Sequence, residues 1–598
     1  MSFHPNEVAR RGRIASFVLI AIFGALGARF FSMQILQHSA YVLQSDKNRL
    51  NEIPLPAPRG VIYDRTGQVI AENVPGYTVS ILPQRRDSLP VVLDRMARLV
   101  PLSPDEHAAT MRRYRQSAPL PAVVFSNATF EVVSILEEHR VEFPGLIIQS
   151  VPKRHYPDSS AASAFVGYTS EINEQELAAR VDSGYRPGQQ IGKSGLEFEY
   201  EAQLRGRDGT RFLEVNASGR VVREAGVRAV LAPEAGPALR TNIDMDLQRF
   251  VAKLFGDSLI GAAIALDPTT GGVLALHSAP AYDPNRFIGG VSEAYYERLR
   301  TDRRNPMYNK AVQGAYAPGS TWKLATAIMA LERGVVRLNE RMPVQCDGGY
   351  TFGNRRFRCW DRAGHGNVTL REALAKSCDV YFYQLGLRLG LDSIAAAGTR
   401  MLFGDRTGID LSPESRSSFP PGQDSALYKY YVDRFRASWW RGQQDGEPLN
   451  LAIGQGANSQ TVVNMARFYT ALASDGYAAK PEIVARDPQR TKIFQLTPEQ
   501  TEALRVAMTE VLSERGTAGS AAIRGVPFAG KTGTAQNPQD PTRDHGWFVG
   551  FAPTNEPKVV VAVLLEFGQH GYLAARVAAR IVEHYLKASV AVPSTTGQ

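Results

Sequence analysis

The residues most able to do chemistry are a serine followed three positions later by a lysine, Ser320 and Lys323. On a helix, these two side chains lie on one face, one turn apart. A lysine amine that has lost its proton can accept the hydroxyl proton of the serine and turn the oxygen into a nucleophile. The pair therefore predicts acyl transfer through a covalent serine ester.

The same serine–lysine spacing occurs again in residues 150–153, so the pattern alone is weak evidence. Pro152 lies inside that second match and would break a helix. Ser320 instead follows Pro318 and Gly319, which are typical of a loop, and precedes apolar residues spaced as the buried face of a helix. We therefore expect Ser320 at a helix start, where free backbone N–H groups can bind a developing oxyanion.

Two further motifs follow in chain order. Ser377 and Asp379 are separated by one residue, and Lys531 begins a Lys-Thr-Gly-Thr run. Lys531 precedes two β-rich stretches, residues 546–551 and 558–565, which predict an antiparallel meander. An edge strand that carries a lysine and two threonines can hold an extended peptide and its terminal carboxylate.

This ordered set of motifs resembles that of penicillin-binding transpeptidases, with aspartate where the family more often has asparagine. The resemblance extends over nearly the whole chain, to about residue 587. Residues 59–67 and 195–206 are similar to signatures of the non-catalytic pedestal domain of class B members. Residues 241–244, 265–271 and 316–320 are similar to segments of their catalytic domain.

Length and composition limit the class of protein. A chain of 598 residues is too long for one ordinary core, so two or three domains are expected. Hydrophobic residues make up 44% of the chain and charged residues 21%, as in ordinary globular proteins. The net charge of +9 is small for this length, and no basic stripe alternates with aromatic residues, which argues against nucleic-acid binding.

The N-terminus predicts a membrane anchor. Three arginines precede an apolar run over residues 14–28, and apolar residues continue after Arg29 to residue 36. Arg29 can extend to the lipid headgroups and lengthen a run that is short for a span of about 20 residues. A cleaved signal peptide is the alternative, but no convincing small-x-small site follows the run. We expect an uncleaved single-pass anchor in the cytoplasmic (inner) membrane, with the bulk of the chain outside the cytoplasm.

The expected fold class is α+β, with a transpeptidase domain of the serine β-lactamase type on an elongated α+β pedestal. Residues 262–266 and 273–276 predict a hairpin at the start of the catalytic domain, and residues 573–587 predict a helix at its end. The expected segments are a cytoplasmic tail (1–13), the transmembrane helix (14–36), the pedestal (37–237), the transpeptidase domain (238–587) and a disordered tail (588–598).

The three cysteines lie close together in the sequence. Cys346, Cys359 and Cys378 enclose His365, and three thiolates with one imidazole suit tetrahedral zinc. The spacing does not match the usual zinc-finger patterns, and a Cys346–Cys359 disulfide with a buried free Cys378 is the alternative. The resemblance favours structural zinc, because elongation-type members can carry zinc beside a serine-x-aspartate motif.

The resemblance also implies a substrate and a role for each motif residue. Ser320 would attack peptidoglycan stem peptides that end in D-alanyl-D-alanine and release the last D-alanine, and an amine of a neighbouring stem would resolve the acyl-enzyme into a cross-link. Lys323 would be the base, in a neutral form favoured by burial near Lys531. Ser377 would relay a proton to the leaving amine, and Asp379 would orient Ser377 and Lys323. The Lys531-Thr532-Gly533-Thr534 strand would bind the substrate carboxylate, and the N–H groups of Ser320 and Thr534 would form the oxyanion hole.

The resemblance makes β-lactams ligands of the same serine, because they mimic the D-alanyl-D-alanine end. Among the two class B branches, the serine-x-aspartate motif and the cysteine cluster favour the elongation type over the division type. The elongation type implies a polytopic glycan polymerase of the SEDS type and rod-complex proteins as partners. A β-lactamase, a β-lactam sensor and a membrane scaffold with dispensable catalysis are the alternatives.

Overall fold

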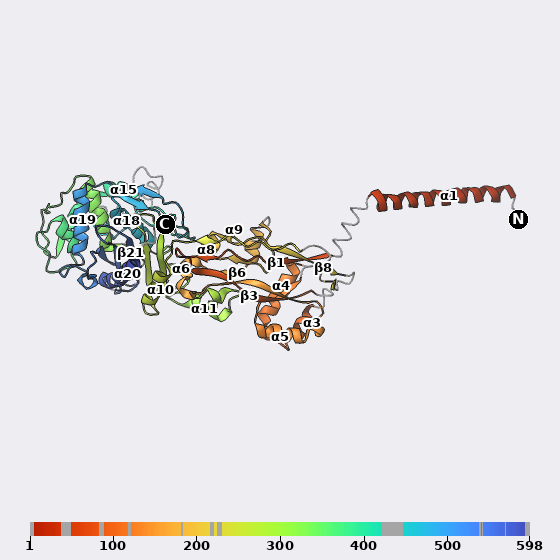
Figure 1. Cartoon of the computed structure of the whole chain (residues 1–598). Helices are drawn as coiled ribbons and strands as arrows, with labels where there is room; N and C mark the ends of the chain where they lie inside the picture. Colours follow the sequence, from red (N-terminus) through yellow and green to blue (C-terminus); the bar gives the residue numbers. More distant parts are fainter. Residues whose placement is uncertain are drawn as a thin grey trace, which may run out of the picture.

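The protein is described from a computed structural model. It covers residues 5–36, 50–82, 89–117, 121–180, 183–215, 221–223, 230–420, 446–537, 540, 542–568 and 570–591. Residues 1–4 of the expected cytoplasmic tail and 592–598 of the expected C-terminal tail lie outside the described residues. The molecule is elongated, with the N-terminal helix at one end, the pedestal in the middle and the catalytic domain at the other end (Figure 1).

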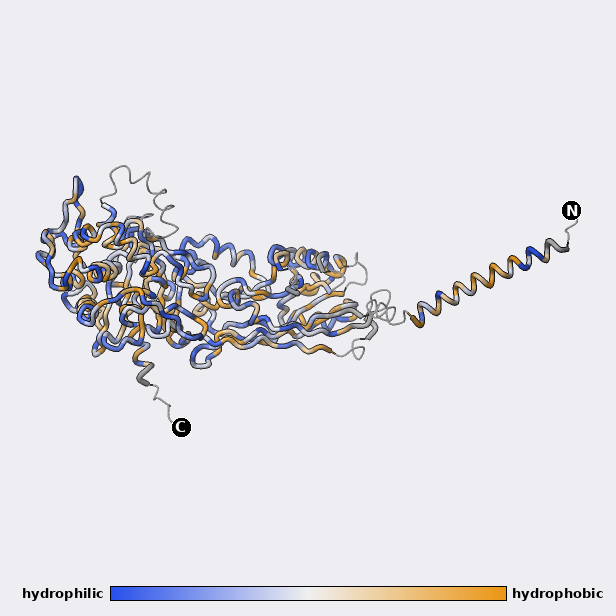
Figure 2. The backbone as a smooth tube through the Cα atoms, turned by 90° about the horizontal axis from the view of Figure 1, so that it is seen from above, coloured by the Kyte–Doolittle hydropathy of each residue, from blue (hydrophilic) through white to orange (hydrophobic). Residues whose placement is uncertain are grey.

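The first helix is long and apolar enough to cross a membrane. Helix α1 (Pro5–Phe31) continues as a π-helical turn, Ser32–Leu36. Within the described chain, Ala9–Leu36 is the one candidate span: it has 28 residues, a mean hydropathy of 2.1 and no buried residues in its most apolar window. Figure 2 shows apolar residues along most of this helix and hydrophilic ones near its N-terminal end, as a single-pass anchor requires.

The pedestal contains two larger antiparallel sheets. One contains β1 (Leu50–Leu55), β8 (Gly209–Val215) and β9 (Val221–Arg223). The other contains β10 (Leu239–Arg240), β2 (Ile62–Tyr63), β3 (Val69–Ile81), β4 (Ala122–Ala128) and β5 (Leu146–His155), with one parallel pair, β10–β2. β3 pairs with β5 along its length. Pro152 lies in β5, so the second serine–lysine match is in a strand, and the sequence argument against it is confirmed.

Short helices complete the pedestal. Helices α3, α4 and α5 bury an apolar core against β3–β5, which includes Leu93, Leu136 and Phe143. The remaining elements form the part nearest the catalytic domain. The bounds are α3 (Leu89–Met96), α4 (Pro104–Ser117), α5 (Phe130–Glu138), α6 (Ser163–Val166), β6 (Thr169–Glu171), α7 (Glu174–Ala178), β7 (Gln190–Gly192), α8 (Gly195–Glu199) and α9 (Glu201–Leu204).

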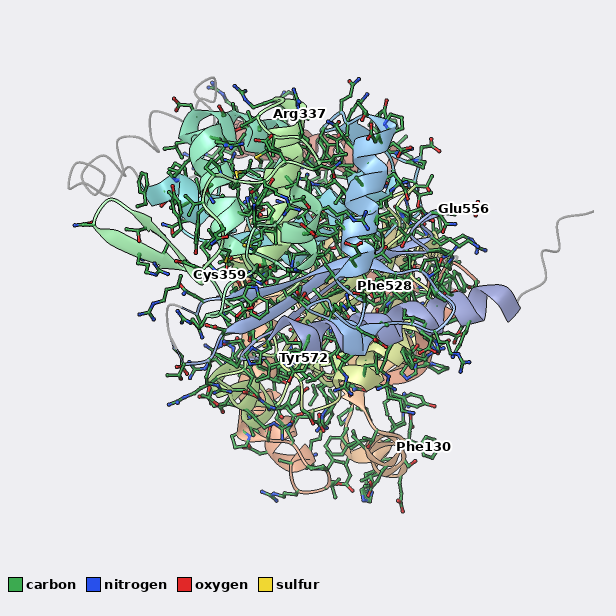
Figure 3. The ribbon with its side chains drawn as sticks, turned by 90° about the vertical axis from the view of Figure 1, so that its left-hand side faces the viewer. Phe130, Arg337, Cys359, Phe528, Glu556 and Tyr572 are labelled. Atoms are coloured by element: carbon green, nitrogen blue, oxygen red, sulfur yellow. The ribbon has the colours of Figure 1, made fainter. Side chains whose placement is uncertain are left out.

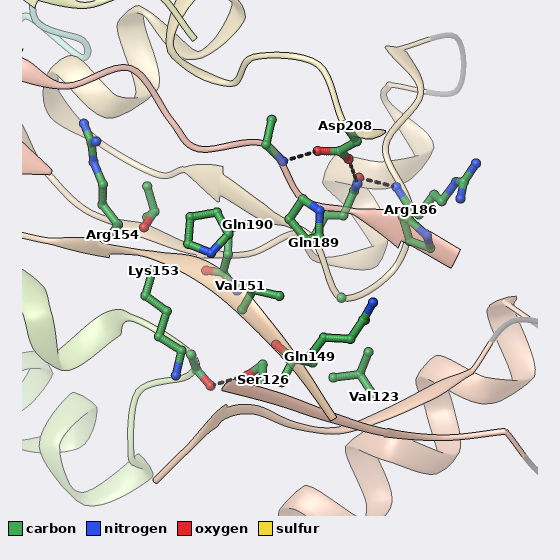
Figure 4. A pocket seen from close by; sticks show the side chains of 18 of the residues that line it. Val123, Ser126, Gln149, Val151, Lys153, Arg154, Arg186, Gln189, Gln190 and Asp208 are labelled. Atoms are coloured by element: carbon green, nitrogen blue, oxygen red, sulfur yellow. Dashed lines mark hydrogen bonds between the residues drawn. The ribbon is translucent and has the colours of Figure 1, made fainter. Parts of the chain in front are cut away.

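A pocket of about 200 Å³ opens between β5 and the loop that precedes β7. Figure 4 shows Gln149, Val151 and Lys153 of β5 on one side, with Arg186 and Gln189 of the loop on the other. Burial lowers the pKa of Lys153 to about 8. None of the catalytic motif residues lines this pocket, so it is separate from the chemistry predicted from the sequence.

A buried charge network joins the two pedestal signatures. Glu197 lies between two arginines, with Arg59 Nη2 at 2.7 Å from Oε2 and Arg154 Nε at 2.5 Å from Oε1. Arg59 also binds Glu201 at 2.8 Å. Burial raises the pKa of Glu197, but the positive charges of Arg154 and Arg59 outweigh it and leave the pKa below its ordinary value. Residues 59–67 and 195–206 both resemble family signatures. The Arg59–Glu197 contact joins these two segments.

The pedestal is tied to the catalytic domain through Tyr200. Its hydroxyl donates to Asp410 Oδ2 at 2.9 Å and accepts from Arg486 Nη2 at 2.8 Å. Asp410 also accepts the main-chain N–H groups of Ile483 and Val484. A single tyrosine at the end of α8 therefore bridges two separate loops of the catalytic domain.

The catalytic domain is built on a five-stranded antiparallel sheet in the order β12–β11–β21–β20–β19. Alternate residues of its strands face two different cores. The helices α10 and α20 pack on one face, and α18 packs on the other face together with the helical part of the domain. The bounds are β11 (Gly261–Leu266), β12 (Val273–Ala279), β19 (Ala529–Ala535), β20 (His545–Ala552), β21 (Val559–Leu565), α10 (Met245–Phe255), α18 (Val462–Ala473) and α20 (Gly571–Ala591).

The middle of the domain is rich in helices, as expected of the α+β class. Its helices are α11 (Glu293–Thr301), α12 (Lys323–Glu332), α13 (Leu370–Ala375), α14 (Asp379–Leu389), α15 (Leu391–Arg400), α17 (Glu447–Ala452) and α19 (Pro498–Glu510). Short strand pairs lie between them: β13 (Ala315–Tyr316) with β16 (Gln460–Thr461), β14 (Gly349–Phe352) with β15 (Arg355–Arg358), and β17 (Tyr477–Ala479) with β18 (Arg490–Lys492).

The strands and helices predicted for the catalytic domain are present, with small changes in their ends. The predicted hairpin is β11–β12, and the predicted meander is β19–β20–β21. Helix α20 extends to Ala591, so residues 588–591, which we expected in a disordered tail, are helical. The helix continues because residues 588–591 include neither glycine nor proline.

Candidate active site

Ser320 lies where a loop becomes a helix, as the sequence predicts. It belongs to a 3₁₀ turn, Gly319–Trp322, that leads directly into α12. Gly319 has a φ of +53°, and a Cβ atom there would lie 2.6 Å from the carbonyl oxygen of Thr534, so glycine is required. Because of this close approach, the main chain beside Ser320 lies against β19. An oxyanion hole formed by the N–H groups of Ser320 and Thr534 requires this arrangement.

The nucleophile loop is fixed from behind by buried groups. The N–H of Gly319 donates to the carbonyl of Gly454 at 2.9 Å, and the hydroxyl of Tyr469 donates to the carbonyl of Thr321 at 2.9 Å. Trp322 is fully buried against Phe403, with ring centroids 4.2 Å apart. Trp322 is therefore a packing residue and not part of the chemistry.

Lys323 connects the first motif to the second. Its side chain is fully buried, and Nζ donates to Asp379 Oδ1 at 2.7 Å, to Ser377 Oγ at 3.1 Å and to the Ser377 carbonyl at 2.7 Å. The sequence places Lys323 one helical turn from Ser320. The structure adds three acceptor atoms from two residues, Ser377 and Asp379, at the junction of α13 and α14. Lys323 and the second motif thus form one hydrogen-bonded group.

Ser377 occupies an unusual backbone position. Its φ is +55°, in the left-handed region that residues other than glycine rarely adopt. Helix α13 ends just before it, and α14 begins at Asp379, so Ser377 is the joint between two helices. The surrounding contacts hold this strained residue with its side chain beside Lys323, as is common for residues at functional sites.

Asp379 accepts hydrogen bonds on both of its oxygens. Oδ1 accepts from Lys323, and Oδ2 accepts the main-chain N–H of Trp360 at 3.0 Å. Burial raises the pKa of Asp379, and the positive charge of Lys323 acts in the opposite direction. Both contacts require an acceptor, which explains why a carboxylate suits this position in this chain.

Lys531 lies on the edge strand that the sequence predicts. Among the described residues, β19 is the last strand of the sheet and pairs only with β20, which leaves its other edge to an added peptide strand. Lys531 is fully buried, and burial, followed by the charge of Lys323, lowers its pKa well below the ordinary lysine value. The lowered pKa belongs to Lys531, whereas Lys323 has Asp379 as its ion-pair partner; the neutral Lys323 expected from the sequence stays a prediction.

The residues after Lys531 are arranged for contact with a substrate strand. Gly533 lies against the nucleophile loop, where a Cβ atom would be 2.8 Å from the Pro318 carbonyl oxygen. Thr534 is exposed, whereas Thr532 is nearly buried and shares a hydrogen bond of 2.7 Å with Thr517 Oγ1. Thr517 was not singled out from the sequence, because a threonine in a loop has no motif to mark it.

The three cysteines and His365 form one cluster. Their ligand atoms all lie within 4.8 Å of one another, and none of the cysteines is in a disulfide. His365 Nδ1 lies 3.6 Å from Cys346 Sγ and 3.5 Å from Cys359 Sγ. Hydrogen bonds from Cys378 and from His365 lower the pKa of Cys359. The disulfide considered as an alternative is absent, and three thiol groups with one imidazole fit the donor set of a tetrahedral metal ion.

The cysteine cluster is connected to the catalytic motif through the main chain. Cys378 lies between Ser377 and Asp379, and Cys359 precedes Trp360, whose N–H binds Asp379. The first connection is evident from the sequence, whereas the second is not. The second could not be found from a motif, because a backbone N–H belongs to every residue type except proline.

The chain matches the family described as "Penicillin binding protein transpeptidase domain" over residues 261–587, and the family described as "Penicillin-binding Protein dimerisation domain" over residues 54–241. The chain belongs to the penicillin-binding transpeptidases. It is 32% identical to the peptidoglycan D,D-transpeptidase MrdA of Acinetobacter baumannii, over 96% of this chain and 88% of the relative. It is 30% identical to MrdA of Escherichia coli K12, over 96% of this chain and 94% of the relative.

The solved structures agree with this assignment. This transpeptidase superposes on penicillin-binding protein 2 from Helicobacter pylori, in its complex with MreC, with a TM-score of 0.78 and 28% identity. The match covers 90% of this chain and 100% of that chain. The chain is thus an elongation-type peptidoglycan D,D-transpeptidase with a pedestal of the dimerisation-domain type.

Proposed function

We propose that this transpeptidase forms its acyl-enzyme on Ser320. The observation that supports this most directly is the buried Lys323, which binds Ser377 and Asp379 at once and follows the Ser320 loop by one helical turn. The substrate is a peptidoglycan stem peptide that ends in D-alanyl-D-alanine. Its backbone adds to the free edge of β19, and its terminal carboxylate binds Lys531 and Thr534.

The acylation step follows from this placement. Ser320 Oγ bonds to the penultimate D-alanyl carbonyl carbon, and its proton passes to the neutral amine of Lys323. Asp379 accepts a hydrogen bond from Lys323 and orients it, and with it Ser377, for the proton transfers. The carbon–nitrogen bond then breaks, and Lys323 passes the proton it took from Ser320 through Ser377 to the leaving D-alanine amine, so that Lys323 is neutral again.

The second step reverses the first with another amine. An amine of a neighbouring stem attacks the ester carbonyl, and its proton passes through Ser377 to Lys323. The carbon–Oγ bond then breaks, and Lys323 returns this proton to Ser320. The N–H groups of Ser320 and Thr534 stabilise the oxyanion in both steps. The product is a cross-link between two stems.

Labelling of the full-length chain with a fluorescent penicillin, followed by peptide mapping, tests this proposal. We expect one labelled peptide, with the adduct on Ser320, and no labelling of the Ser320→Ala variant. Ser150→Ala is the matched control, because Ser150 has the same spacing to a lysine but lies in a strand of the pedestal. A folded wild-type chain that is not labelled on Ser320 would contradict the assigned nucleophile.

We also propose that the cysteine cluster holds a structural zinc ion. Cys346, Cys359, His365 and Cys378 would be its ligands, and their chemistry supports the proposal because three thiolates and one imidazole are a common zinc set. Zinc would brace the Cys359–Trp360 segment and the start of α14 and would take no part in the acyl transfer.

The place of the protein in the cell follows from the anchor and the relatives. We propose a single-pass protein of the cytoplasmic membrane, with residues 1–13 inside, 14–36 in the membrane, the pedestal at 37–237 and the transpeptidase domain at 238–587 outside. The candidate span supports this topology. A solved relative is in complex with MreC, and another match is titled "Structural coordination of polymerization and crosslinking by a peptidoglycan synthase complex". These support a SEDS-type glycan polymerase and rod-complex proteins as partners.

A further inference from the structure

Trp360 lies beside the second motif, and its indole ring is exposed although its position is fixed. The residue is 58% exposed. Its main-chain N–H binds Asp379, and its indole N–H donates to the carbonyl of Lys376 at 3.0 Å. The ring also lies 5.3 Å from that of His365. A large aromatic ring that is held in one orientation and still faces solvent offers a pre-organised contact for a ligand.

The same segment carries an excess of positive charge. Arg355, Arg358 and Arg362 are all exposed, and none has a carboxylate partner among the residues that the structure describes. Their neighbour Arg356 differs, because it pairs with Asp347 at 2.9 Å. Figure 3 shows the β14–β15 hairpin extending from the body of the domain near Cys359. Exposed arginines without partners can form paired hydrogen bonds with a carboxylate.

The reaction itself indicates which substrate meets this surface. In the proposed function the donor stem lies along β19, where its carboxylate meets Lys531. The attacking amine must take the place of the departed D-alanine amine, because the second step is the reverse of the first. That place adjoins Ser377, and the carbonyl of the residue before Ser377 binds the Trp360 indole.

We propose that Trp360, Arg358 and Arg362 form the binding surface for the acceptor stem, which presents the amine in the second step. Trp360 packs against the aliphatic part of the stem, and the two arginines bind its carboxylates. A stem that ends in alanine has at least its terminal carboxylate to offer. This inference rests on the proposed function, since it assigns the second substrate of the same site.

The test uses the full-length chain in detergent with a D-alanyl-D-alanine pentapeptide donor whose side-chain amine is acetylated. The acceptor is a tetrapeptide with a free side-chain amine, supplied with a free C-terminal carboxylate or as its amide. Mass spectrometry gives the ratio of cross-linked to hydrolysed donor. We compare wild type, the R358Q/R362Q variant, Trp360→Leu and the control Arg337→Gln, an exposed arginine that Figure 3 shows well away from Cys359.

We expect the R358Q/R362Q variant to lower the ratio for the free-acid acceptor about threefold to tenfold, through a higher KM for the acceptor. The amidated acceptor should be less sensitive to this change, and Trp360→Leu should lower the ratio for both. Penicillin labelling of Ser320 in the arginine variant should match wild type, as should both assays in Arg337→Gln.

Three results would overturn the inference. The first is an unchanged ratio of cross-linked to hydrolysed donor in both R358Q/R362Q and Trp360→Leu. The others are an equal loss of this ratio in Arg337→Gln, or a parallel loss of penicillin labelling in R358Q/R362Q. A parallel loss of penicillin labelling would mean that Arg358 and Arg362 support the catalytic groups and do not bind the acceptor. Failure of the proposed function is distinguishable, because it would leave the wild-type Ser320 unlabelled before any acceptor is added.

Discussion

At the scale of single residues, Asp379 connects the chemistry to the rest of the domain. It is the only motif residue whose two oxygens bind different segments, Lys323 on α12 and Trp360 on the loop after β15. The more common asparagine has one oxygen, so it would turn an NH₂ group toward either an ammonium or an N–H group. This chain therefore depends on the carboxylate more than the family pattern suggests.

We predict that Asp379→Asn lowers the rate of Ser320 acylation about 10-fold to 100-fold. One buried donor loses its acceptor, which costs about 1–3 kcal/mol. Stopped-flow or time-course labelling with fluorescent penicillin measures the rate. Asp347→Asn is the matched control, because Asp347 pairs with Arg356 at the surface and should leave the rate unchanged. Equal rates for Asp379→Asn and wild type would contradict the assigned contacts.

The residues of the site divide into those that the sequence predicts and those that it does not. Ser320, Lys323 and Lys531 were predicted because their side chains have rare chemistry at fixed spacing. Trp360 acts on Asp379 through its main chain, and Thr517 through a common hydroxyl, so neither has a sequence signal of its own. Their roles depend on where distant loops meet, which a local pattern does not contain.

At the scale of elements, strands were predicted best where apolar residues run without interruption. β20 and β21 are fully buried and were found with almost correct ends. β5 was missed because its residues are largely polar and include Pro152, which suits only an edge strand. β3 also lacks a continuous strand pattern, since Pro75 and Gly76 lie inside it.

The segment between β15 and α14, which includes α13, carries three of the four residues of the cysteine cluster: Cys359, His365 and Cys378. We predict that Cys359→Ala and His365→Ala each lower the melting temperature and slow the acylation of Ser320, because each removes one of four ligands and loosens the Trp360 contact with Asp379. Thermal unfolding and penicillin labelling measure the two effects. His139→Ala, in the pedestal, is the control.

Elemental analysis of the wild-type protein, purified without chelators, gives the metal content. We expect one zinc per chain and a marked loss of zinc in both cluster variants. A wild-type protein without zinc, or variants that keep the wild-type melting temperature and labelling rate, would refute a structural metal at this site.

At the scale of the whole molecule, the elongated shape makes the junctions between its parts important. The anchor and the catalytic sheet are at opposite ends of the molecule (Figure 1), so any signal between membrane partners and Ser320 passes through the pedestal. The contacts on that path include the Glu197 network within the pedestal and the Tyr200–Asp410 contact with the catalytic domain. Both residues come from one short segment: Glu197 lies in α8, and Tyr200 directly follows this helix.

This arrangement predicts a large cost for changing Glu197. The Glu197→Gln variant would leave Arg59 and Arg154 buried with only Glu201 as a charged partner, and the loss of one member of a buried pair costs about 3–5 kcal/mol. At about 2–4 °C per kcal/mol, the melting temperature should fall by roughly 6–20 °C. Penicillin labelling at low temperature checks that the catalytic domain is still folded.

Glu137→Gln is the matched control, because Glu137 forms an exposed pair with Arg140 that contributes about 0.3–0.5 kcal/mol at most. Its melting temperature should stay within about 2 °C of wild type. If Glu197→Gln and Glu137→Gln had the same melting temperature, the buried network would not stabilise the pedestal. The contact between the two signature segments would then need another explanation. If only Glu197→Gln melted early, one buried carboxylate would account for the joining of two signatures far apart in the chain.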